Sequence, residues 1–410
     1  MNPVVIIPTY WAQTDTSGSF IRSSVYDFTT PITTPLPELE VCLESLEQVR
    51  GMLRVIVLVV ASPSCATSAR ARVNAICRAH ADLNPLVIGG EESDTVRRAI
   101  ATVAPQLEGE TVSLRGYGAI KNMGLAVASI FGHDTAVFLD DDAVVLDDNY
   151  LIDAVYGLGT KTKQSQLIAA KTGYLLNRAG NDSPFAQTKR VRWADKLWSR
   201  SAGYNLVMKK AISLARISAS NIMIGGCCAL HAEAYMRVPF DPFITRGEDF
   251  DYLLNMRARG MHVWMDNEWC VRSQPPVVTS EPQRFLQDAY RWCYESRKLE
   301  KSNASRRLHK VTPESLAPSP GPWISDDVRS RISGTALRRF IAGPDRGEYL
   351  RIFLSGRHEA DRWAESVAAR YLPFAAAWPH LMAALWDQKA LRARLLRTGT
   401  ATNRMGFAAR

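Results

Sequence analysis

The sequence predicts an α/β protein in which a mostly parallel sheet, flanked by helices, precedes a helical region. Two observations lead to this fold class. Short apolar runs and helix-like repeats alternate through residues 1–145, which is the pattern of a parallel sheet with helices on both faces. From Pro282 onward the pattern is helical only, with polar and Pro-rich interruptions. We therefore expect an α/β domain at residues 1–281 and a separate helical domain at residues 282–410.

The expected strands and helices follow from the spacing of apolar residues. A strand covered on both faces is a continuous apolar run, as in Arg54 to Ala61, whereas a helix repeats apolar residues every three or four positions. The expected strands are 2–7, 54–61, 85–88, 135–139 and 262–265, and the expected helices are 37–49, 66–81, 93–103, 119–130 and 248–259. The first strand is expected to stop at a turn, Pro8-Thr9-Tyr10, ahead of a long loop at residues 11–36.

The composition is that of a soluble globular protein, with 46% hydrophobic and 22% charged residues. No apolar run reaches the roughly 18–20 residues that cross a membrane, and the N-terminus lacks the pattern of a signal peptide. We therefore expect a cytoplasmic protein. The seven cysteines include no CxxC pair, so we expect small buried side chains rather than disulfide partners or zinc ligands.

The net charge of +9 is concentrated towards the C-terminus. Residues 284–410 hold 23 Lys and Arg against 12 Asp and Glu, whereas residues 1–283 hold 27 against 29. A basic tail of this kind either forms a solvated helix surface or attracts an anionic partner. The roles left open for its helices are self-association and contact with the inner face of a membrane. Nucleic acid is not expected as a partner.

Three adjacent carboxylates, Asp140-Asp141-Asp142, follow the apolar strand at 135–139. Adjacent carboxylates repel one another unless a positive charge neutralises them. Asp140 and Asp142 share a face if the strand continues, because side chains alternate with period two. Hard oxygen ligands suit Mg²⁺ or Mn²⁺, which also take phosphate oxygens and water. The sequence therefore predicts a divalent cation at Asp140 and Asp142, with an exposed acidic turn as the alternative.

Two further segments carry candidate chemistry. Arg246-Gly247-Glu248-Asp249 opens a predicted helix, where the helix dipole favours acids. Either helix capping or a general base acting on a hydroxyl group explains these carboxylates. Gly116 to Gly124 places glycines and Lys121 at another helix start, a position that favours an anion such as phosphate. A surface lysine at an ordinary helix start is the alternative there.

Together these segments resemble the GT-A glycosyltransferases, particularly the family-2-type enzymes, over about residues 2–275. The strand with Pro8-Thr9-Tyr10 is similar to the opening strand of that family. Gly118-x-x-Lys121-Asn122-x-Gly124 is similar to its conserved segment before the metal motif, and Asp140-Asp141-Asp142 to its DxD motif. Gly225-Gly226 and Arg246-Gly247-Glu248-Asp249 resemble its glycine pair and its ED motif. The resemblance implies a Rossmann-like GT-A fold with a donor half at residues 1–145 and an acceptor half at 146–281.

The resemblance also implies an activity and the residues that carry it. The activity is metal-dependent transfer of a sugar from a nucleotide-diphosphate sugar, with UDP- or GDP-sugar expected, to a hydroxyl group of a sugar or other acceptor. Inversion is expected, with Asp249 as the base and Mn²⁺ or Mg²⁺ at Asp140 and Asp142. The expected donor-binding residues are Pro8, Thr9, Tyr10, Ser62, Gly118, Lys121, Asn122, Asp140 and Asp141. The expected acceptor-binding residues are Gly225, Gly226, Arg246, Glu248 and Trp193.

The sequence departs from this family at two places. The second strand ends in Val60-Ala61-Ser62-Pro63, without the usual acid that reads the base, and residues 269–275 lack the usual metal-binding histidine. The base and the third metal ligand are therefore left open. The alternative functions are a retaining transferase, a sugar nucleotidyltransferase, a haloacid-dehalogenase-like phosphatase and a non-catalytic scaffold whose basic tail binds an anionic partner.

Overall fold

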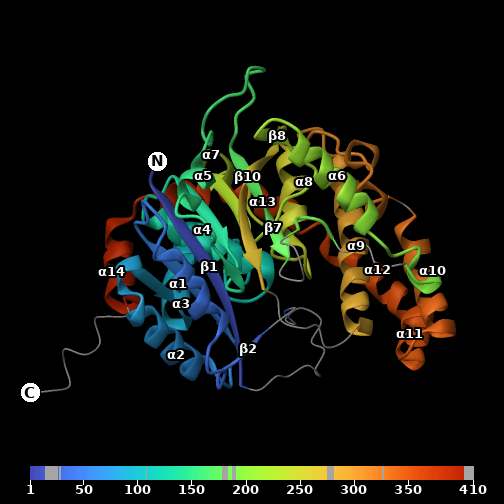
Figure 1. The fold of residues 1–410 in the computed structure, drawn as a ribbon, viewed down its shortest axis with the longest axis horizontal. Coiled ribbons are helices and arrows are strands. Elements are labelled where there is room, and N and C mark those ends of the chain that lie inside the picture. Colours follow the sequence, from blue (N-terminus) through green and yellow to red (C-terminus); the bar gives the residue numbers. More distant parts are fainter. Residues whose placement is uncertain are drawn as a thin grey trace, which may run out of the picture.

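The computed structural model describes most of the chain and confirms the predicted fold class. The described residues are 1–13, 26, 29–107, 109–177, 183–186, 191–274, 281–325 and 327–400. Figure 1 shows a central sheet with helices α1, α2, α3 and α14 at one end and helices α9 to α12 at the other. The C-terminal region is helical, as the sequence predicts.

The sheet is parallel in its first half and mixed in its second half. Strands β4, β3, β1 and β5 lie side by side and are all parallel. Strand β9 is antiparallel to both β5 and β7, and β7 is parallel to β10. The strands are β1 Pro3–Ala12, β2 Thr30–Pro31, β3 Val55–Ala61, β4 Pro85–Ile88, β5 Thr135–Leu139, β6 Ala143–Val144, β7 Ala170–Asn177, β8 Ile217–Ala219, β9 Cys227–His231 and β10 Val263–Ser273.

The first strand is longer than the sequence predicts, because it continues through Pro8-Thr9-Tyr10 instead of turning there. The N–H of Val5 donates to the carbonyl oxygen of Arg54, which leads into β3, so every second residue of β1 faces that strand. Pro8 then faces the opposite side, where pairing with β5 has already ended at Ile6. The missing N–H of proline therefore removes no ladder hydrogen bond. Much of the predicted loop at 11–36 lies outside the described residues.

The five helices predicted in the first 281 residues lie close to their predicted positions, whereas α5, α6 and α7 were not predicted. Helix α3 begins three residues earlier than predicted, at Gly90. Helix α4 is buried along almost its whole length, since it lies between the sheet and helix α13 of the tail. The helices are α1 Glu38–Leu46, α2 Ala66–Ala79, α3 Gly90–Val103, α4 Tyr117–Ile130, α5 Tyr150–Val155, α6 Ser201–Ser213, α7 Ala232–Tyr235 and α8 Glu248–Ala258.

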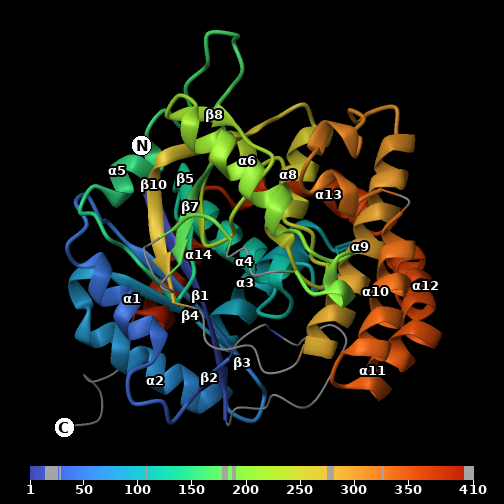
Figure 2. The ribbon, with the colours of Figure 1, turned by 45° about the vertical axis from the view of Figure 1, so that its right-hand side comes forward.

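The tail helices pack against the sheet domain as well as against one another (Figure 2). The hydroxyl of Ser129 in α4 donates to the carbonyl oxygen of Met382 in α13 at 3.2 Å. The indole N–H of Trp378 in α13 donates to the carbonyl oxygen of Tyr235 at 2.7 Å. The predicted domain boundary at residue 282 stays a prediction. The tail helices are α9 Glu281–Ala304, α10 Val328–Ala342, α11 Arg346–Arg351, α12 Arg357–Val367, α13 Tyr371–Leu385 and α14 Lys389–Gly399.

The cysteines lie as predicted. All seven are free, and six of them are buried, with Cys270 partly buried. Among the described residues, none of the helices is both long enough and apolar enough to cross a membrane.

Candidate active site

Most of the site residues predicted from the sequence line one cavity. It has a volume of about 290 Å³ and lies where β1 and β5 end and α8 begins. Predicted residues in its wall are Tyr10, Lys121, Asp140, Asp141, Asp142, Gly225, Gly226, Arg246, Glu248 and Asp249. Because the carboxyl ends of parallel strands meet at one edge of a sheet, residues far apart in the chain meet there.

The acidic triplet forms one wall of this cavity. Burial raises the pKa of Asp142 to about 7, and the neighbouring Asp140 carboxylate adds to the rise. Burial, and then the charge of Asp142, raise the pKa of Asp141 well above its ordinary value. Burial also raises the pKa of Asp140, although Lys121 opposes the shift. Three ionised carboxylates are therefore costly here unless a cation lies among them.

The glycine pair stands directly against the triplet. A Cβ atom on Gly226 would collide with the carboxylate of Asp140, so only glycine leaves that carboxylate in place. The ammonium group of Lys121 donates to the carbonyl oxygen of Gly225 at 2.8 Å. Burial lowers the pKa of Lys121, but Glu248 and Asp140 outweigh it, so the net shift is upward. Lys121 therefore stays charged and stabilises the two acidic groups on either side of it.

The start of helix α8 also lines the cavity, close enough to the triplet for the charge of Asp249 to act on Asp140. Gly247 caps the helix with φ of +72°, a left-handed conformation that favours glycine. The Asp249 carboxylate accepts one hydrogen bond from the N–H of Gly225 at 3.2 Å and one from the N–H of Phe250 at 2.7 Å. Burial raises the pKa of Glu248 to about 7, and Lys121, 3.8 Å away, opposes the rise. The cavity thus contains an oriented carboxylate, Asp249, beside Glu248, which holds its proton more tightly than an ordinary glutamate does.

Arginines complete the wall on the side of the tail. Arg246 and Arg291 both line the cavity. Nη1 of Arg246 donates to Oδ1 of Asp288 at 3.0 Å, and Nη2 of Arg200 donates to Oδ2 of the same carboxylate at 3.1 Å. Nη2 of Arg291 donates to the carbonyl oxygen of Gly247 at 3.3 Å. Helix α9 of the tail therefore supplies part of the cavity wall.

Some predicted site residues do not reach this cavity. Asn122 is fully buried, and its amide group exchanges two hydrogen bonds of 2.9 Å with the backbone of Phe240. A Cβ on Gly118 would collide with the backbone of Asp241, so this glycine permits close packing. Predicted residues outside the cavity wall are Pro8, Thr9, Ser62, Gly118, Asn122 and Trp193. Their roles in ligand binding stay predictions.

Trp193 and Trp198 differ in their surroundings. Trp193 is 51% exposed, and the guanidinium of Arg338 lies 5.3 Å from its ring centroid. Trp198 is buried against the rings of Phe285 and Trp323. Trp198 therefore packs in the hydrophobic core.

The sequence reading missed several residues of the cavity wall. Thr30 lies within the predicted loop at 11–36 and Glu38 follows it, and the hydroxyl of Thr30 donates to Glu38 at 2.8 Å. Tyr117 joins Tyr10 and Tyr26 in a cluster of rings at one side of the cavity. Arg291 comes from the tail, beyond the reach of the family resemblance. A signal for it was present, since Arg291 lies among the aromatic and aliphatic residues that form the buried face of helix α9.

The effect of a buried carboxyl group on stability can be tested at Glu295, which lies one turn beyond Arg291 in α9. Its carboxyl group is fully buried without a hydrogen-bond partner among the described residues. Burial raises the pKa of Glu295 to about 8, and Arg291 opposes the rise. The folded state therefore binds the Glu295 proton more tightly than the unfolded state does. The contribution of this carboxyl group to the free energy of unfolding is fully present at low pH and is lost as the pH rises towards 8.

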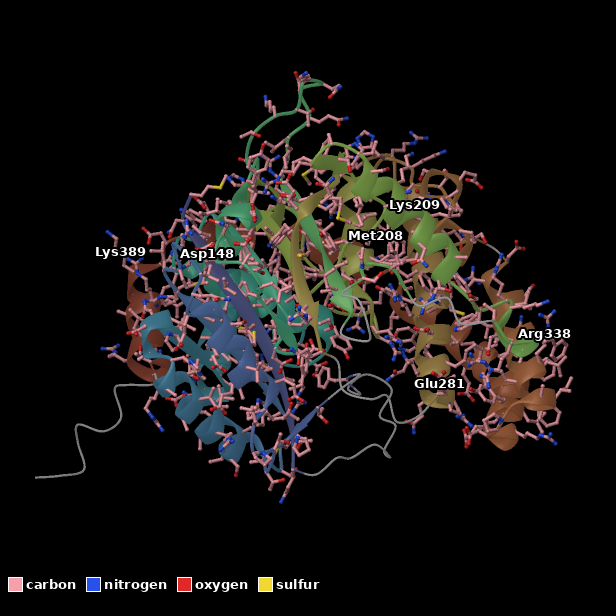
Figure 3. The ribbon with its side chains drawn as sticks, in the orientation of Figure 1. Asp148, Met208, Lys209, Glu281, Arg338 and Lys389 are labelled. Atoms are coloured by element: carbon pink, nitrogen blue, oxygen red, sulfur yellow. The ribbon has the colours of Figure 1, made fainter. Side chains whose placement is uncertain are left out.

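We expect Glu295→Gln to remove this loss. Relative to wild type, the free energy of unfolding of the variant should rise by about 1.4 kcal/mol per pH unit between about pH 5 and 7. Urea unfolding at several pH values measures the difference. The matched control is Glu281→Gln, because the Glu281 side chain at the start of α9 is 71% exposed (Figure 3). A difference from wild type that does not change with pH would contradict the raised pKa.

Comparisons with known proteins find distant structural likeness only. No family model matches the chain, and no curated protein matches it in sequence. A mannosyltransferase from Pyrobaculum calidifontis, solved with GDP-Man and Mn²⁺, has a TM-score of 0.45 and 16% identity, covering 96% of this chain and 86% of that chain. Glucosyl-3-phosphoglycerate synthase from Mycobacterium tuberculosis, solved with Mn²⁺, UDP and phosphoglyceric acid, has a TM-score of 0.36 and 13% identity, covering 67% and 72%. GalNAc-T7, solved with UDP, GalNAc and Mn²⁺, has a TM-score of 0.41 and 12% identity, covering 81% and 57%. At this distance they do not establish the family or the activity of the chain.

Proposed function

We propose that the chain is a metal-dependent glycosyltransferase that moves a sugar from a nucleotide-diphosphate sugar to an acceptor hydroxyl group. The observation that carries the proposal is the convergence of Asp140-Asp141-Asp142, Gly225-Gly226 and Glu248-Asp249 on one cavity. These three segments are the ones on which the sequence resembles GT-A glycosyltransferases. A chance acidic turn or a simple helix cap would not bring them together.

The residues present suit a divalent cation. The carboxylates of the triplet are hard oxygen donors whose pKa values are raised by burial, and Lys121 offsets this rise only in part at Asp140. No group of three or more His, Cys, Asp and Glu side chains within the described residues is already arranged to hold a metal ion. Asp140 and Asp142 would therefore hold Mn²⁺ or Mg²⁺ together with donor phosphate oxygens and water. When bound, the cation would neutralise charge on the leaving diphosphate.

The chain's own residues supply orientation and a proton acceptor. Lys121 holds the carbonyl oxygen of Gly225, and this contact fixes the turn against which Asp140 lies. Asp249 takes the proton from the acceptor hydroxyl group as the hydroxyl oxygen bonds to the anomeric carbon. The bond from that carbon to the diphosphate oxygen breaks, and attack opposite this bond inverts the stereochemistry. Cytoplasmic location, and association of the tail with a membrane or a second copy, remain predictions from the sequence.

Calorimetric titration of nucleotides tests the proposed function. UDP, GDP, dTDP and CDP are titrated into the protein with and without Mn²⁺, and the series is repeated on Asp142→Ala. We expect one nucleotide to bind only with metal, and its affinity to fall by at least about tenfold in the variant, the loss of a charged ligand contact. If no nucleotide binds to the folded protein with metal present, the proposed function is wrong.

A further inference from the structure

Helix α9 of the tail places an arginine directly on the residue that opens α8. Nη2 of Arg291 donates to the carbonyl oxygen of Gly247 at 3.3 Å. A Cβ atom on Gly247 would collide with Cζ of Arg291, so the guanidinium group covers this glycine closely. Only glycine therefore leaves room at the start of α8 for this side chain of the tail.

Aromatic rings hold the guanidinium group of Arg291 in place. The group lies 4.4 Å from the ring centroid of Trp292, and the residue is only 9% exposed. The ring centroid of Phe250, in the first turn of α8, lies 5.9 Å from the same group. Rings at this distance attract a guanidinium group and restrict its orientation. Arg291 is therefore a fixed contact between α9 and α8, unlike an arginine on a solvated helix surface.

Arg291 takes this position although a possible partner lies on its own helix. Glu295 is four residues further along α9, which is the spacing at which arginine and glutamate side chains can pair on a helix. Both oxygens of the Glu295 carboxyl group and Nε of Arg291 are nevertheless buried without a hydrogen-bond partner among the described residues. Buried polar groups without partners are unfavourable. An arrangement that leaves them so is typical of a functional site, where stability is given up for geometry.

Through Gly247 this contact reaches the proposed base. Asp249 lies two residues after Gly247, and its carboxylate accepts hydrogen bonds from the N–H groups of Gly225 and Phe250. The direction of the carboxylate therefore depends on where α8 begins relative to the turn at Gly225. A base must lie within about 3 Å of the hydroxyl group whose proton it takes, so a small shift of α8 is expected to lower the rate.

We propose that Arg291 is a positioning residue for the transfer reaction. By holding Gly247, it fixes the start of α8 and with it the direction in which Asp249 meets the acceptor hydroxyl group. The inference rests on the proposed function, and it makes the helical tail part of the catalytic unit. Arg291 acts through Asp249 and needs no contact with the substrate.

Hydrogen exchange in Arg291→Met tests the contact without any substrate. The carbonyl oxygen of Gly247 also accepts from the N–H of Asp251 at 3.2 Å, and Gly225 donates to Asp249 at 3.2 Å. If Arg291 holds this segment, the amide hydrogens of Asp251 and Gly225 should exchange at least about threefold faster in the variant, because the start of α8 opens more often. Unchanged exchange at both amides would overturn the inference.

Kinetics of the full chain test whether Arg291 acts through the base. The donors are the glucose, galactose, mannose and N-acetylglucosamine derivatives of the nucleoside diphosphate that binds, with Mn²⁺ present and water as the acceptor, and the release of nucleoside diphosphate is measured. We expect Arg291→Met to lower kcat roughly ten- to one-hundredfold and to change nucleotide affinity by less than about twofold. In the Asp249→Asn background the same substitution should lower kcat by less than about threefold, because the group on which Arg291 acts is already removed.

Two further variants serve as controls, and urea unfolding shows whether each variant is folded. Arg291→Lys keeps the charge and should recover part of the rate. Arg331→Met is the matched control, because Arg331 of α10 also lies over a tryptophan ring, 5.5 Å from the centroid of Trp323, but is not part of the cavity wall. Its kcat should equal that of wild type.

Two kinetic results would overturn the inference. An equal fall in kcat in both backgrounds would mean that Arg291 serves the stability of the fold and not the base. A loss of nucleotide affinity in Arg291→Met would assign Arg291 to donor binding. Failure of the nucleotide titration on the wild-type protein is a separate result, which would remove the proposed function and this inference with it.

Discussion

Asp249→Asn is expected to lower kcat by about a thousandfold, while the affinity for the nucleotide changes by less than about twofold. General-base catalysis by a positioned side chain contributes roughly 10²–10⁴ in rate, and the amide cannot accept the proton. The nucleotide should still bind, because the proposed metal ligands Asp140 and Asp142 remain in place.

The substitution carries a small structural cost. Both oxygens of the Asp249 carboxylate accept backbone hydrogen bonds, one from Gly225 and one from Phe250. The asparagine side chain has only one acceptor oxygen, so one N–H loses its partner, at a cost of about 1 kcal/mol in stability. Thermal unfolding of the variant separates this effect from the loss of catalysis.

Steady-state kinetics and calorimetry on the same preparation measure the two quantities. Asp148→Asn is the matched control, because Asp148 (Figure 3) is a surface carboxylate paired with Arg50 and is not part of the cavity wall. Its kcat should equal that of wild type. A kcat for Asp249→Asn within about tenfold of wild type would place the base elsewhere, with Glu248 next to be tested.

Lys298→Met is expected to destabilise the protein by about 3–5 kcal/mol, the largest stability effect of a single substitution proposed here. Lys298 reaches from α9 of the tail into a buried pocket, where it donates to Asp241 at 2.9 Å and pairs with Asp251 of α8. The hydroxyl of Tyr294 also donates to Asp241, at 2.7 Å. Methionine replaces the unbranched stem of lysine but not its ammonium group, so both buried carboxylates lose their cation.

Urea unfolding measures the effect, and a second substitution tests its cause. Adding Asp251→Asn to Lys298→Met removes one stranded carboxylate and should restore part of the lost stability. Lys209→Met on the exposed face of α6 is the matched control and should change stability by less than about 0.5 kcal/mol (Figure 3). If Lys298→Met costs no more than this control, the network does not join the tail to α8.

Local pattern was enough to predict most elements of residues 1–145, helix α8 and the acidic segments of the site, but not α5 to α7 or β7 to β9. Strand β4 lies at its predicted position, and α2 and α8 end within two residues of their predicted ends. Each of these depends on residues within a few positions of one another. The prediction of a turn at Pro8-Thr9-Tyr10 was wrong, because the pairing of β1 with β3 outweighs the local tendency of proline to end a strand.

Site residues separated far in the chain could not be placed in the same way. Asn122 has the position expected of a ligand-binding residue, yet its amide group is used by the backbone of Phe240. Arg291 has no motif that connects it with the acidic triplet, but it lines the same cavity. Whether a polar side chain faces a ligand or a neighbouring backbone depends on packing between distant segments.

The sequence by itself determined the alternation of strands and helices, the helical tail, the acid triplet at the end of β5 and the acidic start of α8, because these follow from the order of neighbouring residues. Only the tertiary structure decided that Lys121 lies buried between acids, and that α9 brings Arg291 to the cavity. The physical reason is that charges act over distances of a few ångströms in space, and the folding of the sheet and tail sets those distances.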